Sequence, residues 1–497
     1  MVRWMSSWEA RSYLGGAFVC SLYAIPHAYG TAALNTMQAL LQRFLHDGIQ
    51  KRFGADLSEG AMTLVWSLSL TCSFLMGALA TALFSNRLAD SWGRRPTLLV
   101  SGPCLTLIEC FSFIGAFWLD SVGLFVCGLF LHAVCFSLSH VVAATYLMEV
   151  SSPKCRASVV VFVNVLLNLG STGGALLCRG DLLGTERSWW MVYGLSFVAA
   201  AITLMVGVTF LPESPKWLYL LKRNEVATLN ALKSFRVPDG EIEGVLEIIR
   251  RENVEANRSN RVTLSRLICD SRMSRFVFVT LLVGLTGPLS MGGHLLHLFS
   301  TVVFESAGLP LITAQTYTAA IGVCHAAFAI TNIFVVRLLN RRPHLLIGVT
   351  LVNGGLLACS AFGAVQSGWA GHCAAVGLLV ASASGTIPRF LTHFLASEYS
   401  VLRYRAVATS LSHVMHDVAS VPMTAAFFPL IHALGPLGLT PFIGANVLVN
   451  VLLLCVLPES RNRYVDVVFA ELVPDVRREE CEGLLEMRRS DPRRHTC

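Results

Sequence analysis

Charged side chains are scarce in this sequence. Asp, Glu, Lys and Arg make up only 14% of its 497 residues, whereas hydrophobic residues make up 54%, and the mean hydropathy is +0.60. A soluble domain carries roughly 25% charge, so the composition excludes an ordinary soluble protein and indicates a membrane protein. The net charge of +7 does not indicate nucleic-acid binding, because the cations lie in a few loops between apolar runs.

Signals for catalysis and metal binding are also missing. The 15 Cys residues are scattered, many of them inside apolar runs, and none shows the spacing of a metal site. We therefore expect buried free thiols, no metal and no cofactor. Since no nucleophile–base group is visible, we also expect no catalytic residue and no enzyme activity. The first apolar segment is too long for a signal peptide and lacks a cleavage site, so we expect the protein to keep it.

Long runs without Asp, Glu, Lys or Arg recur along the whole chain, and a spanning helix needs roughly 20 mostly apolar residues. In the first half these runs are 12–41, 61–86, 96–119, 121–148, 157–178 and 188–212. In the second half they are 276–304, 306–336, 345–366, 372–397, 406–434 and 438–458. Within these segments, charge appears only at Glu109, Arg389 and Asp417. The predicted fold class is an all-α membrane protein with twelve transmembrane helices in two six-helix halves.

A charged insert separates the two halves. It begins behind the Leu-Pro-Glu-Ser motif that starts at Leu211, and this motif recurs at Leu457, where the second half ends. Within the insert, apolar residues recur at helical spacing in 226–235 and 242–249, which predicts short amphipathic helices. The predicted domains are an N-terminal half at 1–212, a cytoplasmic helical linker at 213–275, a C-terminal half at 276–458 and a cytoplasmic tail at 459–497.

Further motifs repeat between the halves. Arg94–Leu99 is echoed at Arg341–Leu346, and the pair Glu149 and Arg156 is echoed by Glu398 and Arg405. These echoes and the repeated Leu-Pro-Glu-Ser share nearly one offset along the chain, which indicates an internal duplication. Two six-helix halves in the same topology fit the parallel repeat of the major facilitator architecture.

Loop cations predict the orientation, because cytoplasmic loops carry an excess of Lys and Arg. When the loops are numbered alternately, one side receives both termini, the insert and most of the cations. The other side receives only Arg43, Lys51, Arg52, Arg179 and Arg187. We therefore expect both termini and the insert to lie in the cytoplasm.

Several motifs together resemble one known family. They lie at Asn86–Arg95, Tyr146–Arg156, Leu211–Leu218, Ser300–Gly308 and Pro458–Ser460. These stretches are similar to signature motifs of the sugar porter family of the major facilitator superfamily, and specifically of animal facilitative glucose transporters, over residues 12–468. The resemblance implies facilitative, uniport-like transport of a hexose or related small polar solute by alternating access. It also implies a multi-pass protein of the plasma membrane, functional as a monomer in the lipid bilayer.

The resemblance further implies a gating salt-bridge network at the cytoplasmic helix ends. Its members are Asp90, Arg94, Arg95, Glu149, Arg156 and Glu213 in the first half and Arg341, Arg342, Glu398, Arg405 and Glu459 in the second. Such pairs hold the halves together in one state and release them in the other. The alternative is ordinary solvated loop charge, since exposed pairs contribute only about 0–1 kcal/mol. The second half departs from the family pattern at Arg337, Leu338 and Asn340.

The expected substrate site departs further from the family, which binds sugar hydroxyls through amide side chains. By resemblance, the substrate-binding positions carry Asn164, His294, His325, His393, His416 and Asp417, and Arg389 joins them by its depth. At ~1.5 Å per residue, Asp417 lies about 18 Å from Arg405 along its helix. Arg389 lies about 14 Å from Glu398. Both are near the midplane of a core ~30 Å thick, where a charge indicates a functional site.

Other interpretations stay open for these residues. In one alternative, Arg389 and Asp417 pair only with each other and serve to fix helix packing. Each His can likewise be a hydrogen-bonded packing residue. Glu109 has no family counterpart, and we expect it to be protonated or bonded to a backbone group. The Asp and Arg of proton-linked sugar porters correspond here to Gly30 and Leu129. That substitution favours facilitated diffusion, although histidines titrate near neutral pH and leave a different proton route open.

Two further functions stay open beside hexose transport. A carrier retuned to a non-sugar solute, such as an organic anion, fits the histidines and Arg389 of the expected site. The second further function is that of a non-transporting sugar sensor. Sensors often carry a long signalling tail, however, and the tail predicted here is short.

Overall fold

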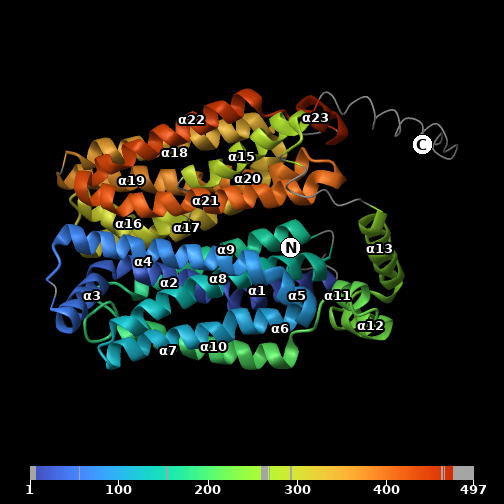
Figure 1. Ribbon diagram of the computed structural model, residues 1–497, viewed down its shortest axis with the longest axis horizontal. Helices are drawn as coiled ribbons and strands as arrows, with labels where there is room; N and C mark the ends of the chain where they lie inside the picture. The colour runs from blue at the N-terminus through green and yellow to red at the C-terminus, as the bar shows by residue number, and fades with distance from the viewer. Residues whose placement is uncertain are drawn as a thin grey trace.

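The computed structural model of the protein consists of helices, and the residues that it describes form no strand (Figure 1). The described residues are 7–54, 56–152, 155–258, 267, 269–290, 294–365, 367–460, 463 and 465–473. Most of the helices run side by side in two groups, which are drawn in blue to green and in yellow to red. We call them the first and the second helix group.

The first helix group contains the helices up to Phe210. Its members are α1 (Ser7–Leu22), α2 (Ala24–Thr36), α3 (Gln38–Phe53), α4 (Glu59–Ala80), α5 (Asn86–Trp92), α6 (Arg94–Leu99), α7 (Leu105–Trp118), α8 (Val122–Val150), α9 (Arg156–Leu177) and α10 (Trp189–Phe210). Single turns of π-helix at Thr81–Ser85 and Val100–Cys104 join α4 to α5 and α6 to α7, so each pair forms one long rod.

The second helix group begins after the insert. Its members are α15 (Ser274–Leu289), α16 (His294–Ser306), α17 (Leu311–Leu338), α18 (Arg341–Gly363), α19 (Gly368–Ser384), α20 (Thr386–Glu398), α21 (Leu402–Leu434) and α22 (Thr440–Val456). Between the groups, the insert forms α11 (Pro215–Leu220), α12 (Glu225–Ser234) and α13 (Asp239–Arg258), and α23 (Val465–Leu472) follows the last rod. Short 3₁₀ turns at Ser271–Met273 and Gly435–Leu439 complete the described elements.

The rods have the length and composition of membrane helices. In the described part of the chain, eight helical stretches are long and apolar enough to cross a membrane, and one of them, Val407–Val456, contains two predicted spans. The predicted span at 12–41 covers most of α1, all of α2 and the start of α3, and the spans at 157–178 and 306–336 correspond mainly to α9 and α17. Large apolar side chains such as Leu68, Ile202 and Leu351 are exposed on the outside of the bundle. The twelve-helix fold class predicted from the sequence is therefore confirmed.

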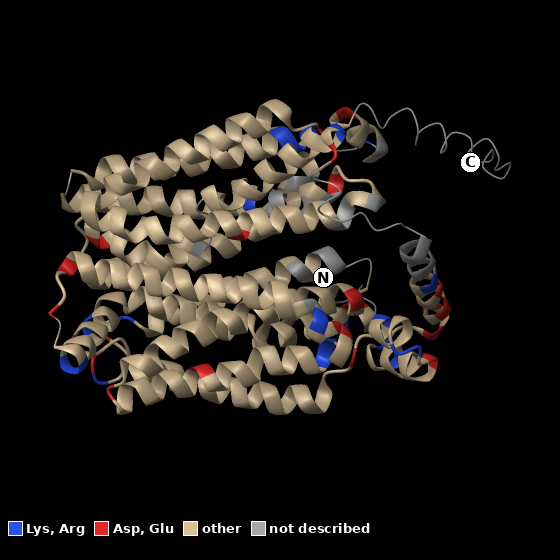
Figure 2. Cartoon of the chain, viewed as in Figure 1, with Lys and Arg blue, Asp and Glu red and all other residues tan. Residues whose placement is uncertain are grey.

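The two ends of the bundle differ. The insert helices α11–α13 lie at one end together with α23, and α3 lies at the other (Figure 1). We call these the insert end and the far end. Most of the charged residues that the structure describes lie at the two ends and on the insert, and few lie along the rods between them (Figure 2). This distribution is the one that an apolar membrane core requires, because charge inside it is costly.

The apolar core is shared at the far end and divided at the insert end. One buried cluster includes Leu34 and Trp66 of the first helix group together with Phe299 and Phe427 of the second. Nearer the insert end, one cluster belongs to the first group and its insert and another to the second group. Between the groups, α9 packs against α17, α4 against α21 and α2 against α16.

Candidate functional site

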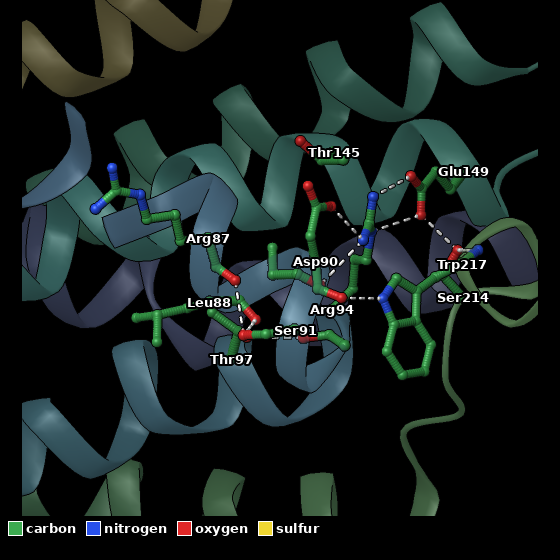
Figure 3. Close-up of polar contacts among 12 residues, drawn as sticks. Arg87, Leu88, Asp90, Ser91, Arg94, Thr97, Thr145, Glu149, Ser214 and Trp217 are labelled. Carbon is green, nitrogen blue, oxygen red and sulfur yellow. Dashed lines mark hydrogen bonds and ion pairs between the residues drawn. The ribbon is translucent and has the colours of Figure 1, made fainter. Parts of the chain in front are cut away.

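At the insert end of the first helix group, Arg94 is the centre of a polar network (Figure 3). Its Nε and Nη2 atoms donate to the two carboxylate oxygens of Glu149, at 3.2 Å each. Its Nη1 atom donates to Asp90 Oδ1 at 3.0 Å and to the Ala89 carbonyl at 3.0 Å. The guanidinium therefore joins the loop between α5 and α6 to the end of α8 through a bidentate ion pair, the geometry that Arg favours.

Glu213 closes the same network from the end of α10. Its carboxylate accepts the backbone N–H groups of Arg94 at 3.0 Å, Arg95 at 3.1 Å and Ser214 at 2.8 Å. A carboxylate at a helix N-terminus is favourable because it pairs N–H groups that lack intrahelical partners. Burial raises the pKa of the Glu213 carboxyl, and these N–H groups partly offset that effect.

Two residues of the Leu211–Leu218 stretch hold the insert against this network. The Ser214 hydroxyl donates to Glu149 Oε2, and the Trp217 indole donates to the Asp90 carbonyl at 3.0 Å (Figure 3). Ser214 also accepts the backbone N–H of Trp217 at 3.3 Å and so caps α11. The first insert helix is thus attached to the ends of α5 and α8.

The second helix group repeats this arrangement with other residues. Arg341 Nε and Nη2 donate to the two oxygens of Glu398 at 3.0 Å and 2.7 Å. Glu459 accepts the backbone N–H groups of Arg341 and Arg342 at 2.9 Å and 3.2 Å. Ser460 donates to Glu398 Oε2 at 2.7 Å, as Ser214 does to Glu149 in the first group. In each group, the Arg of the ion pair stands at the start of a helix whose N–H groups are capped by a second Glu. A Ser hydroxyl donates to the carboxylate of the ion pair.

The ion pairs are not solvated loop charges. The side chains of Arg94 and Glu149 are each 11% exposed, and those of Arg341 and Glu398 are 14% and 27% exposed. Removing one partner from such a pair leaves a charge with little water around it, which costs far more than breaking an exposed pair. The side chains of Arg156 and Arg405, the remaining expected members, lie outside the described residues.

At the far end, polar contacts cross between the helix groups. Asn35 of α2 donates to Ser300 Oγ and to the His297 carbonyl at 2.9 Å each, and it accepts the N–H of Thr301 at 3.2 Å. The Gln315 side chain of α17 donates to the Thr36 carbonyl at 2.9 Å. Sequence reasoning missed these residues, because an uncharged polar side chain near a helix end gives no distinctive signal.

Two more far-end contacts involve α4 and α9. The Ser67 hydroxyl donates to the Ala425 carbonyl at 2.8 Å, which joins α4 to α21. Ser171 Oγ of α9 lies 3.1 Å from His297 Nδ1 of α16. Together with the shared apolar core, these contacts close the two groups on each other at the far end.

Several expected substrate-binding residues are exposed between the far-end contacts and the insert end. Asn164 of α9, Arg389 of α20 and Asp417 of α21 are exposed, and His416 is half-buried. Arg389 lies close enough to His140 of α8 to interact electrostatically, and the electrostatic neighbour of Asp417 is His413. Helices of both groups therefore contribute polar side chains to this part of the bundle.

His325 is buried in this structure, unlike the exposed members of the expected site. It is 2% exposed, its Nδ1 lies 3.0 Å from His297 Nε2, and its Nε2 lies 2.7 Å from the Ser382 carbonyl and hydroxyl oxygens. Both ring nitrogens thus have protein partners, and the ring packs between α16, α17 and α19. The side chains of His294 and His393 lie outside the described residues.

Glu109 has a partner that sequence reasoning did not foresee. Glu109 Oε1 lies 2.7 Å from His132 Nδ1, and both residues are buried. The pairing depends on the register between the neighbouring antiparallel helices α7 and α8, which the sequence does not reveal.

Comparisons with known proteins agree with the geometry. A family model described as "Sugar (and other) transporter" matches residues 16–469. The chain is 27% identical over 331 residues to the horse facilitated glucose transporter member 5 of solute carrier family 2, an alignment that covers 65% of this chain and 64% of that protein. The mouse member 5 protein is 25% identical over 447 residues, with 88% of this chain and 87% of that protein covered.

A solved structure has the same fold. It is titled a partially occluded inward open conformation of the xylose transporter XylE from E. coli. It superposes with a TM-score of 0.72 at 16% identity, and the match covers 92% of this chain and all of that one, 100%.

Proposed function

The chain belongs to the sugar (and other) transporter family, and from that premise we propose that it moves a hexose or a related small polar solute across a membrane by facilitated, uniport-like alternating access. One observation carries the proposal. The two helix groups share an apolar core at the far end, whereas at the insert end each group has its own core and its own buried ion pair. Two units joined at one end and separate at the other are the arrangement that alternating access needs.

The proposed path runs along the exposed polar residues between the two groups. Asn164 offers an amide that both donates and accepts, and His416 offers an imidazole that does the same when neutral. Arg389 and Asp417 add charge. A sugar hydroxyl also donates and accepts, so these side chains match it. We propose the same role for His294 and His393 from their place in the sequence. His325 is buried, and we propose that it stabilises the helices behind the path.

We propose that the two ion-pair networks act as gates. Among the side chains that the structure describes, each ion pair lies within its own helix group. In the opposite state, closure of the insert end brings the two networks together, and the balance between the states depends on both. The division at residues 1–212, 213–275, 276–458 and 459–497 then corresponds to two moving units, a linker and a tail.

We also propose the cellular setting. Both termini and the insert lie in the cytoplasm, the far end faces outside, and the protein works as a monomer in the plasma membrane without enzyme activity. The cation-rich loops at the insert end support this orientation, because such loops stay on the cytoplasmic side. The structure then represents the state that is open to the cytoplasm.

Uptake of a panel of labelled solutes into vesicles that contain the purified protein tests the function. The panel holds hexoses, a pentose, a polyol and small organic anions. We expect saturable uptake of at least one hexose, inhibited by the unlabelled sugar and absent from empty vesicles. Uptake of anions alone would support the carrier of a non-sugar solute, which the exposed Arg389 favours. Binding of a sugar without any uptake would support a sensor.

A further inference from the structure

A buried chain of polar side chains crosses the first helix group, apart from the ion-pair networks and the proposed path. Glu109 of α7 is 5% exposed and His132 of α8 is 6% exposed. Beyond His132, the chain continues to Thr31 of α2, whose Oγ1 lies 3.1 Å from His132 Nε2. The same hydroxyl lies 3.1 Å from His27 Nε2. Four side chains from three helices are thus linked by consecutive hydrogen bonds.

The packing around the chain fixes the two imidazoles. The His27 ring stacks on the His132 ring, with centroids 4.2 Å apart, and on Phe136 at 3.7 Å. Gly30 makes room for His132, because a Cβ atom at Gly30 would lie only 2.8 Å from His132 Cε1. His27 is half-buried, whereas Glu109 and His132 are buried. The chain therefore leads from a partly accessible ring to a buried carboxylate.

We propose that this chain binds one proton at His132, and that gain or loss of the proton reverses the direction of hydrogen bonding from His132 to His27. The proposal goes beyond solute transport and holds for any solute that the protein carries. It assigns to the first helix group a proton site made of Glu109, His132, Thr31 and His27.

We propose two arrangements of the hydrogens, one with and one without the proton, and Glu109 is ionised in both. The ionised carboxylate of Glu109 only accepts, so His132 Nδ1 keeps its hydrogen in both. With the proton bound, His132 Nε2 also carries hydrogen and donates to Thr31, whose own hydroxyl hydrogen is free to donate to His27 Nε2. Without the proton, His132 Nε2 must accept the Thr31 hydrogen. Thr31 can then only accept from His27, so His27 Nε2 must carry a hydrogen.

Other titratable groups around the chain do not compete for the proton. The groups near Glu109 are Cys110 of α7, Cys135 of α8 and Tyr193 of α10. Thiols and phenols are ordinarily uncharged at neutral pH, whereas imidazole is the side chain that changes charge near it. Of the two imidazoles in the chain, we assign the proton to His132 because this ring is held against the Glu109 carboxylate.

The chain is placed to influence the contact between the helix groups. It joins α2, α7 and α8, and α2 packs against α16 of the second group. On α8, the face that carries His132 continues through Phe136 to His140, which interacts electrostatically with Arg389 of α20. A change of charge and hydrogen bonding at His132 thus acts on helices that contact the other group.

The test needs no substrate. Purified protein in lipid, with isotope-labelled histidine ring nitrogens, is titrated by NMR from acid to alkaline pH, and His132→Gln and His27→Gln assign the two rings. We expect His132 to change from the doubly protonated ring to the neutral Nδ1–H form. At the same pH midpoint, we expect the hydrogen of His27 to move from Nδ1 to Nε2. A His132 ring that keeps one protonation state throughout overturns the proposal.

Variants at Thr31 test the link between the rings. Thr31→Val has the same shape but no hydroxyl, so the changes at His132 and His27 should occur at different pH midpoints. Thr31→Ser keeps the hydroxyl, so the two midpoints should remain the same. As a matched control, Tyr317→Phe removes another hydroxyl–imidazole contact, 3.0 Å from His372 Nδ1 in the second helix group, and should leave both midpoints unchanged. Coincident midpoints in Thr31→Val would show that no relay joins the rings.

A second variant covers the case in which Thr31→Val fails to fold. Glu109→Gln removes the fixed charge beside His132 and should lower the midpoint of that ring by about one pH unit or more. If solute uptake has been established, the pH dependence of uptake should shift with it. An unchanged His132 midpoint in Glu109→Gln contradicts the proton site even when uptake is normal, and normal titration without any uptake contradicts only the transport function.

Discussion

Gly93 and Asn340 hold equivalent places in the two ion-pair networks, yet their backbones differ. Gly93 has a φ of 112°, and a Cβ atom there would lie 2.2 Å from Glu213 Oε2. Asn340 has a φ of −65°, which any residue adopts. Only glycine therefore fits at position 93, where the carboxylate approaches the backbone closely, and this difference explains why the second network tolerates Asn in place of the family's Gly.

Substitution of these two residues by Ala should have unequal effects. Gly93→Ala forces both a strained φ and a clash with Glu213, and we expect a loss of roughly 1–3 kcal/mol in the free energy of unfolding. Asn340→Ala keeps an ordinary φ and should lose less. Thermal unfolding of both variants in detergent compares them directly. Equal stability of the two variants would contradict the described loop geometry.

Glu398 is the residue at which the gating role is best tested. Glu398→Gln replaces a charge-assisted pair with a neutral contact, which changes the balance between states by about 1.5–3 kcal/mol. Transport should fall roughly ten- to a hundredfold, with the amount of folded protein nearly unchanged, and Glu149→Gln should behave alike. The exposed pair of Lys51 and Asp120 supplies the control, and Lys51→Ala should transport normally. Normal transport in both Glu variants would leave the networks a purely structural role.

The residues of the networks were predictable, whereas the buried polar pairs were not. Arg94, Glu149 and their repeats stand at the ends of apolar runs in recognisable motifs, so their neighbours follow from topology. The positions of Glu109, His132 and His325 inside the bundle depend on helix register and rotation. Helix register and rotation can be read from a sequence only where a helix has an amphipathic pattern, and helices that are apolar on all sides have no such pattern.

Among the helices, those that contact the other helix group are the ones on which the proposed function depends most. Contacts from α2 and α9 reach α16 at the far end, and a contact from α4 reaches α21. The predicted spans were correct in number, but the division of the first span at Tyr23 into α1 and α2 was not predicted. Pro26 lies in the first turn of α2 and lacks an N–H to continue the preceding helix, which favours this division.

Locking the contact between α2 and α16 should stop transport. Asn35 and Ser300 touch through their side chains at 2.9 Å, so cysteines at both positions should form a disulfide on oxidation. Transport by Asn35→Cys with Ser300→Cys should be lost on oxidation and return on reduction. In the matched control, Ser300→Cys pairs with Thr318→Cys, a contact of 3.2 Å inside the second helix group. Oxidation of that pair should leave transport active, and its loss there would show that cross-linking harms the protein in a general way.

For the whole molecule, the proposed orientation places the far end outside the cell and the insert inside. Lys51 is exposed on α3 at the far end, and Ser234 is exposed on α12 of the insert. A membrane-impermeant thiol reagent added to intact cells should label Lys51→Cys above the background of the native thiols. It should reach Ser234→Cys only after the membrane is opened. The reverse pattern would invert the orientation.

Obligatory alternation between the two groups is the central claim, and counterflow measures it most directly. Vesicles containing the purified protein are loaded with unlabelled hexose and placed in a trace of the labelled sugar, with no gradient of ions or pH. If one site alternates between the two sides, labelled hexose should accumulate inside transiently and then decline to equilibrium, and the oxidised Asn35→Cys with Ser300→Cys protein should show no such overshoot. A labelled sugar that never exceeds its outside concentration, while the protein is folded and a labelled organic anion does overshoot, would contradict hexose transport by this chain.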